Sequence, residues 1–288
     1  MAQSDPPTHQ GVRLLRGARI GLHLLWAAMT VASVYPFIGN SRRLWLKQRW
    51  SRQLLEILGV RIDAQLSGAA PGSLFVVNHV SWLDIYALNA ARPMAFVAKA
   101  EVSRWPLVGW LSANTDTLFL SRESRRQAKE MNERISGLLT ADKDVACFPE
   151  GTTTDGTEVL KFHSALLQSA IDSGRPVQPV ALAYYDADGR RSRVPAYAGD
   201  TTMGESLAAI LACRSLTVRL RPTSSLDPRV MTRSEMAQAA QGAIAVSLGL
   251  PSGNEWAEPI DAPRINSSVG GQADCDISAT RLNPASAG

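Results

Sequence analysis

A histidine and an aspartate five positions apart are the side chains in this sequence with the clearest chemical use. They lie in the segment Asn78-His79-Val80-Ser81-Trp82-Leu83-Asp84. A carboxylate that accepts one imidazole N–H fixes the ring tautomer, and it stabilises the imidazolium formed when the other nitrogen takes a proton. The pair is therefore suited to remove a proton from a hydroxyl group or from water.

The spacing of this pair sets a condition on the local structure. On one continuous helix, residues five apart point about 140° away from each other. His79 and Asp84 can meet if His79 lies in a turn and the helix begins at Ser81, with Ser81 as the N-cap and Asp84 in the first turn. An alternative stays open at this point, in which Ser81 and Asp84 form a simple capping pair and His79 only fills the turn.

Two cations follow apolar runs that have the length of a buried strand. Lys99 comes directly after residues 95–98, and Arg122 follows residues 118–120. An arginine guanidinium binds phosphate oxygens through a planar fork, whereas a lysine ammonium acts as a point charge. Both residues are candidates to hold an anionic substrate, although ordinary surface cations give the same pattern.

A turn-forming loop follows a third apolar run, residues 145–148. It has the sequence Pro149-Glu150-Gly151-Thr152. The glycine permits a close backbone approach, and the amides and hydroxyls of such a loop can bind an anion or a hydroxyl group. We expect Glu150 to orient Arg122 or to bind a substrate hydroxyl; the alternative is an ordinary threonine-rich loop.

The elements that must position these residues alternate along the chain from residue 60 onward. Continuous apolar strands are covered on both faces, so the pattern predicts an α/β fold with a mostly parallel sheet flanked by helices. The carboxyl ends of parallel strands lie along one edge, where we expect the candidate residues to meet. The predicted strands are residues 60–66, 74–77, 95–98, 118–120, 145–148, 180–183 and 216–220, and the predicted helices are residues 84–91, 124–139, 164–173, 205–211 and 234–248.

The N-terminal part of the chain is apolar and basic. Residues 20–39 contain no Lys, Arg, Asp or Glu, and about 20 such residues can span a bilayer. Residues 41–58 continue as an amphipathic, basic helix, which is typical of a segment at an anionic lipid surface. We therefore expect a membrane-associated segment that spans the bilayer or lies in its interface. A cleaved signal peptide and a buried core helix are the alternatives, and nucleic-acid binding is not expected.

The chain divides into three predicted parts. Residues 1–59 form a leader with membrane-associated helices, residues 60–250 an α/β domain, and residues 251–288 a disordered, acidic tail rich in Ser, Gly, Asn and Pro. The three cysteines are far apart, so they predict no disulfide framework and favour a reducing compartment. The four histidines include no pair at helical ligand spacing, so no metal site is expected.

Together these residues resemble the glycerophospholipid acyltransferase family, typified by lysophosphatidic acid acyltransferases, over about residues 70–185. The first family motif, Asn-His-x4-Asp, is matched by residues 78–84, and Phe-Pro-Glu-Gly-Thr stands intact at residues 148–152. Residues 116–122 approximate Gly-x-Ile-Phe-Ile-x-Arg, but Asp116 replaces the glycine, which leaves the backbone conformation there in question. Residues 177–180 match the fourth motif loosely.

The resemblance implies an O-acyltransferase in which His79, supported by Asp84, deprotonates the hydroxyl of a lysolipid acceptor. The acceptor would be 1-acylglycerol-3-phosphate, giving phosphatidic acid. Because Thr153 stands where lysophosphatidate enzymes often have arginine, lyso-ornithine lipid or another lysophospholipid is the alternative. The donor would be acyl-CoA or acyl-carrier protein, with no cofactor. The expected substrate-binding residues are Asn78, Ser81, Lys99, Arg122, Glu150, Gly151 and Thr152.

The N-terminal segment would place the enzyme on the cytoplasmic face of the inner membrane, where lysolipids reside. A different class, a thioesterase or lipid hydrolase, would use the same His79–Asp84 pair to activate water. A third class, a non-catalytic lipid-binding scaffold, predicts that the histidine is dispensable.

Overall fold

The computed structural model describes residues 8–120 and 125–251. Arg122 and residues 252–288 of the predicted tail lie outside these residues. The strands are β1 (Val60–Ala64), β2 (Leu74–Val77), β3 (Ala95–Lys99), β4 (Thr117–Leu120), β5 (Val145–Cys147), β6 (Val177–Tyr185) and β7 (Leu216–Pro222). The helices are α1 (Gln10–Ser33), α2 (Asn40–Leu58), α3 (Leu83–Ala91), α4 (Val108–Ala113), α5 (Arg125–Thr140), α6 (Gln168–Ser173), α7 (Met203–Ala212) and α8 (Arg233–Leu248), with 3-10 turns η1 (Tyr35–Phe37), η2 (Ala100–Arg104) and η3 (Ala165–Leu167).

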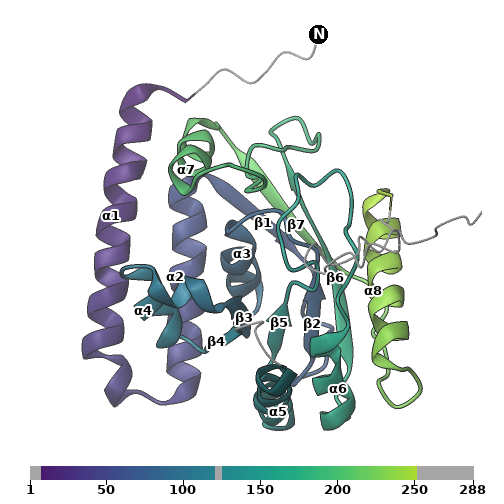
Figure 1. Cartoon of the computed structure of the whole chain (residues 1–288). Coiled ribbons are helices and arrows are strands. Elements are labelled where there is room, and N and C mark those ends of the chain that lie inside the picture. The colour runs from purple at the N-terminus through teal and green to yellow at the C-terminus, as the bar shows by residue number, and fades with distance from the viewer. Residues whose placement is uncertain (1–7, 121–124, 252–288) are drawn as a thin grey trace, which may run out of the picture. The chain divides into compact units, whose positions relative to one another are not determined.

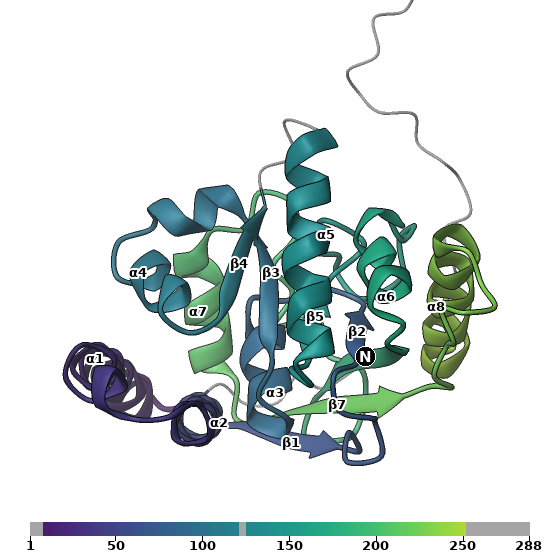
Figure 2. The same ribbon diagram turned by 90° about the horizontal axis from the view of Figure 1, so that it is seen from below.

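The strands form a seven-stranded sheet in the order β1-β7-β6-β2-β5-β3-β4. Neighbouring strands are parallel except for β6 and β7, which are antiparallel. The predicted mostly parallel α/β fold is therefore confirmed (Figures 1 and 2). Because β1 and β7 run against the other five strands, the carboxyl ends of β6, β2, β5, β3 and β4 share one edge of the sheet.

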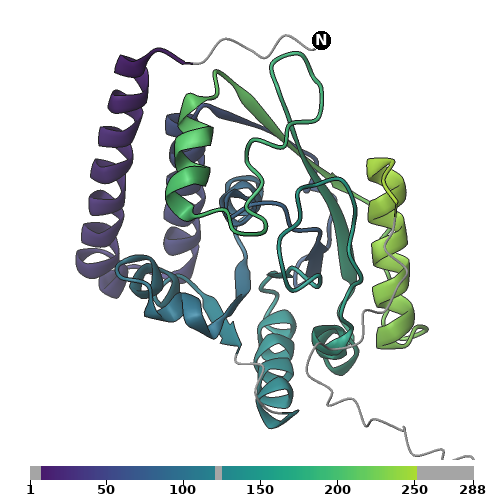
Figure 3. The same ribbon diagram turned by 45° about the horizontal axis from the view of Figure 1, so that its top comes forward.

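Two apolar clusters cover the two faces of the sheet. Strand β2 contributes to both, because successive side chains of a strand point to opposite faces: Phe75 and Val77 belong to one cluster, Leu74 and Val76 to the other. Helices α2, α3 and α7 supply buried residues to the first cluster, and α5, α6 and α8 to the second. Figures 1 and 3 show α2 and α8 on opposite sides of the sheet.

Helix α1 packs along α2 through a pair of stacked rings, and each ring also contacts a backbone carbonyl of the other helix. The ring of His23 stacks on Trp50 with a centroid distance of 4.8 Å. His23 Nε2 lies 3.0 Å from the Trp50 carbonyl, and Trp50 Nε1 donates to the His23 carbonyl at 3.2 Å. Helices α1 and α2 thus form a defined helical hairpin.

The outer surface of α1 remains apolar. Leu14, Leu22 and Leu25 are 76%, 68% and 55% exposed. By length and composition, the run Gln10–Phe37 is apolar enough to cross a membrane, and only 22% of its most apolar window is buried. This helix is therefore not the buried core helix that the sequence left as an alternative.

Asp116 stands where the family motif has a glycine, and the structure shows its backbone conformation. Its φ of +64° is in the left-handed region, which glycine adopts most readily, so the backbone keeps a glycine-like conformation without the glycine. The Asp116 carboxylate lies 3.3 Å from Nζ of Lys47, a buried lysine of α2 that also donates to the Met94 and Thr115 carbonyls. The substitution therefore joins α2 to the start of β4.

Candidate active site

The turn that carries His79 begins with an asparagine that continues the sheet. Asn78 follows the last residue of β2, and its side-chain Nδ2 donates to the Leu182 carbonyl of β6 at 2.9 Å. The Leu182 N–H donates back to Asn78 Oδ1 at 2.8 Å. Because the buried amide is used in this way, Asn78 fixes where β2 ends, and the substrate contact expected from the sequence stays a prediction.

The histidine and the aspartate meet, as the turn hypothesis requires. Helix α3 begins at Leu83 with Trp82 as its N-cap, one residue later than the expected cap at Ser81, so Asp84 is its second residue. The fully buried Asp84 accepts three hydrogen bonds at Oδ2, from His79 Nδ1 (2.8 Å), the Val80 N–H (2.8 Å) and the Ser81 N–H (2.9 Å). The Ser81 hydroxyl accepts from the Leu83 N–H at 3.3 Å. Ser81 is not the N-cap residue of α3, which is Trp82.

The imidazole of His79 is held in one orientation with one nitrogen available. With Nδ1 facing the Asp84 carboxylate, the neutral ring carries its hydrogen on Nδ1 and its free lone pair on Nε2. The ring stacks on Phe148 with a centroid distance of 3.9 Å and an interplanar angle of 12°. The side chain is 19% exposed. The arrangement can therefore take a proton from a group that approaches from the open side.

Glu150 ties this turn to the loop after β5. Its Oε1 accepts from the His79 N–H at 2.6 Å and its Oε2 from the Leu160 N–H at 2.9 Å. Burial raises the pKa of Glu150 to about 7, and the negative charges of Asp84 and Glu158 add to this while the two backbone bonds oppose it. These described contacts are to the backbone. The contact with Arg122 or a substrate hydroxyl expected from the sequence stays a prediction, since Arg122 lies outside the described residues.

The same loop wraps around the backbone of His79. The Thr154 N–H donates to the His79 carbonyl at 2.8 Å, and the Thr153 hydroxyl donates to the Tyr197 carbonyl. Gly151 has a φ of +70°, a conformation that a residue with a side chain rarely adopts. Thr152 is exposed. The loop therefore fixes the turn and leaves Thr152 free to face solvent or substrate.

The two predicted phosphate-binding cations have different outcomes. Lys99 ends β3 and is exposed at the edge where β2 also ends. Strand β5 lies between β3 and β2, which separates the two strand ends by about 10 Å. Arg122 lies outside the described residues, so its predicted role stays a prediction.

Tyr184 is the residue at this site that sequence reasoning missed. It lies near the end of β6, is 2% exposed, and donates its hydroxyl to Asp84 Oδ1 at 2.6 Å. The available signal was a tyrosine at the end of an apolar strand, because a buried tyrosine hydroxyl nearly always has a hydrogen-bond partner. The identity of that partner was not visible in the sequence.

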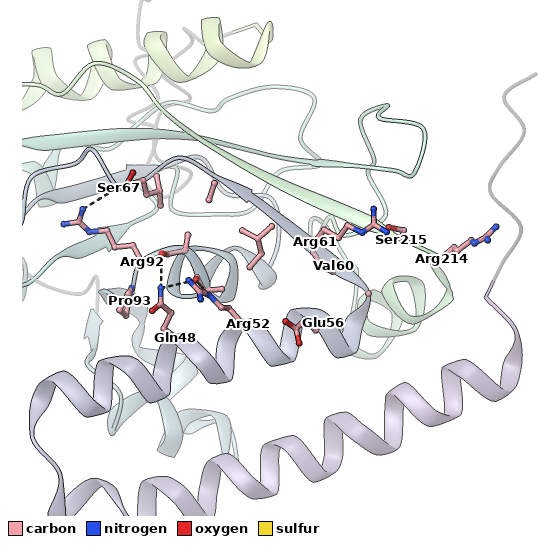
Figure 4. Close-up of a pocket in the computed structure, with 16 residues that line it drawn as sticks. Gln48, Arg52, Glu56, Val60, Arg61, Ser67, Arg92, Pro93, Arg214 and Ser215 are labelled. Carbon is pink, nitrogen blue, oxygen red and sulfur yellow. Dashed lines mark hydrogen bonds between the residues drawn. The ribbon is translucent and has the colours of Figure 1, made fainter.

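A groove of about 1170 Å³ lies away from this turn, along edge strand β1. Figure 4 shows Arg52 and Glu56 of α2 and Arg61 of β1 lining it, with Arg214 at one end. None of His79, Asp84 and Glu150 lines the groove. Within residues 8–120 and 125–251, no group of three or more His, Cys, Asp or Glu side chains is arranged to hold a metal ion.

The fold and the site define an α/β protein in which a partly exposed histidine is bonded to a buried aspartate at the carboxyl edge of a mostly parallel sheet. The family model described as Acyltransferase matches residues 61–183. A lyso-ornithine lipid O-acyltransferase from Pseudomonas aeruginosa is 34% identical over 250 residues, covering 83% of this chain and 92% of that protein. A second such enzyme, from Rhodobacter capsulatus, is 30% identical over 260 residues, covering 85% and 93%.

Other relatives match a shorter region or the fold. A 1-acyl-sn-glycerol-3-phosphate acyltransferase from Neisseria meningitidis is 42% identical over 163 residues, which cover 57% of this chain. The match spans 64% of that relative, slightly under two thirds of its length. The crystal structure of PlsC, the 1-acyl-sn-glycerophosphate (LPA) acyltransferase from Thermotoga maritima, has a TM-score of 0.60 at 20% identity, covering 82% of this chain and 96% of that chain. It shows the same fold.

These matches confirm the family resemblance. The chain belongs to the glycerophospholipid and lysolipid acyltransferase family.

Proposed function

We propose that the protein transfers a fatty acyl group from an acyl thioester to the hydroxyl of a lysolipid, with His79 as the general base. The observation that carries the proposal is the 2.8 Å contact of His79 Nδ1 with the buried Asp84 carboxylate, which leaves Nε2 as the proton acceptor. A base positioned in this way typically contributes a rate factor of about 10² to 10⁴.

The reaction then needs no covalent acyl-enzyme. His79 Nε2 takes the proton of the acceptor hydroxyl while its oxygen attacks the thioester carbonyl carbon. A C–O bond forms, the C–S bond breaks, and the leaving thiolate takes the proton from the imidazolium as the free thiol. Asp84 stabilises the imidazolium between these two steps. Alignment of the two bound substrates supplies much of the remaining rate, since it can contribute about 7–11 kcal/mol.

The first proposed acceptor is 1-acylglycerol-3-phosphate. The 42% identity to the Neisseria relative over the region of the motifs supports it, as does the exposed cation Lys99 at the same sheet edge as His79. A phosphate monoester needs such cations.

Lyso-ornithine lipid is the second candidate acceptor, and different observations favour it. The relatives with that printed name match over 83% and 85% of this chain, far more than the phosphate-specific relatives. Thr153 gives no positive charge to the loop after β5, and its hydroxyl is bonded to the Tyr197 carbonyl. An amino-acid head group does not require a cation at that position.

We further propose that acyl-CoA or acyl-carrier protein is the donor and that the enzyme works on the cytoplasmic face of the inner membrane. The exposed apolar surface of α1 supports this location, because it matches the lipid phase in which the acceptor resides.

One experiment tests the base and the acceptor together. Wild type, His79→Ala and the control His9→Ala, which alters an exposed histidine before α1, are assayed with both lysolipids and both donors. We expect His79→Ala to lose at least a hundredfold in kcat and His9→Ala to match wild type. Thiol release by wild type that continues unchanged without any lysolipid would support a thioesterase instead.

A further inference from the structure

The Asp84 carboxylate has two oxygens, and different parts of the fold satisfy them. All three donors to Oδ2 come from residues 79–81, in the turn that directly precedes α3, the helix that carries Asp84. The donor to Oδ1 is the Tyr184 hydroxyl of β6, one hundred positions later in the chain. Among the bonds of the described residues, this fourth one fastens the carboxylate to the sheet.

The position of Tyr184 is itself fixed by the site. Two residues earlier on β6, the Leu182 backbone exchanges two hydrogen bonds with the side chain of Asn78. Residues two apart on a strand share one face, and Leu182 and Tyr184 both belong to the apolar cluster that contains α3. The register of β6 against the His79 turn therefore aims the tyrosine at Asp84.

The hydroxyl acts as a donor throughout the working pH range. Burial, followed by the adjacent charge of Asp84, raises the pKa of Tyr184 well above its usual value. The other titratable groups near the carboxylate are His79, in direct contact, and Glu150, which senses the charge of Asp84. A short hydrogen bond from a neutral hydroxyl draws negative charge toward Oδ1 and away from the oxygen that faces the imidazole.

We propose that Tyr184 is a positioning residue that holds Asp84 in place and sets the pH range over which His79 is neutral. This inference rests on the proposed role of His79 as the base. Without the tyrosine hydroxyl, Oδ1 loses its partner and more negative charge faces the ring. The protonated imidazole is then favoured, so the acid limb of the pH–rate profile moves to higher pH.

The variant Tyr184→Phe tests this proposal, with Tyr185→Phe as the matched control. Tyr185 is the next residue on β6 and lies on the opposite side of the strand, where Arg219 stacks over its ring. For Tyr184→Phe we expect kcat to fall about tenfold and the acid limb of kcat/KM to move up by about one pH unit, with KM for both substrates within about twofold. The control should match wild type.

An NMR titration of the His79 ring nitrogens gives a readout that does not depend on turnover. Its midpoint should move to higher pH in Tyr184→Phe and stay at the wild-type value in Tyr185→Phe. If His79→Ala retains activity, the proposed function fails, yet this titration still decides whether Tyr184 controls the protonation of His79. A Tyr184→Phe protein that is less stable but has a wild-type titration overturns the inference, because the hydroxyl is then only structural.

A second substitution covers the case in which the phenylalanine variant does not fold. Replacing Tyr184 by 3-fluorotyrosine keeps the ring and the hydroxyl but makes the hydroxyl a stronger donor. More charge is then drawn from the carboxylate, so the titration midpoint of His79 should move to lower pH. An unchanged or higher midpoint contradicts the proposal.

Discussion

The turn around His79 and the outer surface of α1 are built on opposite principles. In the turn, a buried carboxylate, a buried glutamate and a buried amide each bond to specific partners, so polar atoms are hidden and paired. On α1, large apolar side chains such as Leu14 and Leu22 face outward. The His79 turn holds a few polar atoms in fixed positions, whereas α1 presents a broad apolar surface.

This contrast separates two kinds of contribution to one reaction. A buried polar group that loses its partner costs about 1–3 kcal/mol or more, so changes in the turn act on individual atoms and on chemistry. Exposed apolar surface is unfavourable in water at about 25 cal/mol per Å², so α1 gains stability when a lipid surface covers it. Variants in the two regions should therefore fail in different assays.

The largest expected effect comes from removing the charge of Asp84. Asp84→Asn keeps the size of the side chain but removes the negative charge that stabilises the imidazolium. Its amide Nδ2 must also replace one of the two acceptor oxygens, which face the His79 turn and the Tyr184 hydroxyl. We expect kcat to fall about a thousandfold with vesicle binding unchanged. Asp188→Asn, an exposed aspartate, is the control. A loss of vesicle binding in Asp84→Asn would contradict the separation of the two regions.

The stability of the protein should depend on pH through Glu150, which bonds the His79 turn. The pKa of Glu150 is raised from 4.5 to about 7, so the folded state holds this proton more tightly than the unfolded chain. Its contribution to the free energy of unfolding is complete below about pH 4.5 and is lost as the pH rises to about 7, a change of about 3 kcal/mol.

Urea unfolding of wild type and Glu150→Gln at about pH 5 and about pH 8 measures this contribution. The stability of wild type relative to Glu150→Gln should fall between the two pH values, because glutamine does not titrate. Glu133→Gln, on the exposed face of α5, should show no such difference. An equal pH response of wild type and Glu150→Gln would mean that Glu150 keeps an ordinary acidity.

The apolar surface of α1 should control membrane recruitment. Leu22→Ser with Leu25→Ser removes two exposed leucines, and we expect binding to anionic phospholipid vesicles to weaken about tenfold to a hundredfold. Activity on a short-chain, monomeric lysolipid should be unchanged. The control replaces Val230 and Val246, which are 79% and 82% exposed, by serine. Equal vesicle binding by both double variants would refute a lipid-facing role for α1.

The smallest expected effect concerns Asp116, directly before β4. Asp116→Gly and Asp116→Ala both remove the partner of Lys47, but only glycine suits a φ of +64°. We expect Asp116→Ala to be less stable than Asp116→Gly by about 1 kcal/mol in thermal unfolding. Equal stabilities would show that the left-handed backbone relaxes when the carboxylate is removed.

Much of the fold was predictable because local patterns decide it. Apolar runs separated by helical segments predicted the strands and most helices, and continuous apolar strands predicted a sheet covered on both faces. Helix α4 was missed because six residues give no clear period. The N-cap of α3 was placed one residue early because Ser81 looks like an N-cap, whereas in the fold Trp82 is the cap and Asp84 captures the backbone N–H groups of the turn.

The amino-acid sequence by itself determined the family, the α/β class and the condition under which His79 and Asp84 can meet, since each depends on residues close together in the chain. Only the tertiary structure decided that β6 lies beside β2 and antiparallel to β7, that Tyr184 holds the second oxygen of Asp84, and that Glu150 bonds the His79 turn. The reason is physical: such contacts depend on strand order and register, and the same local patterns are compatible with several strand orders.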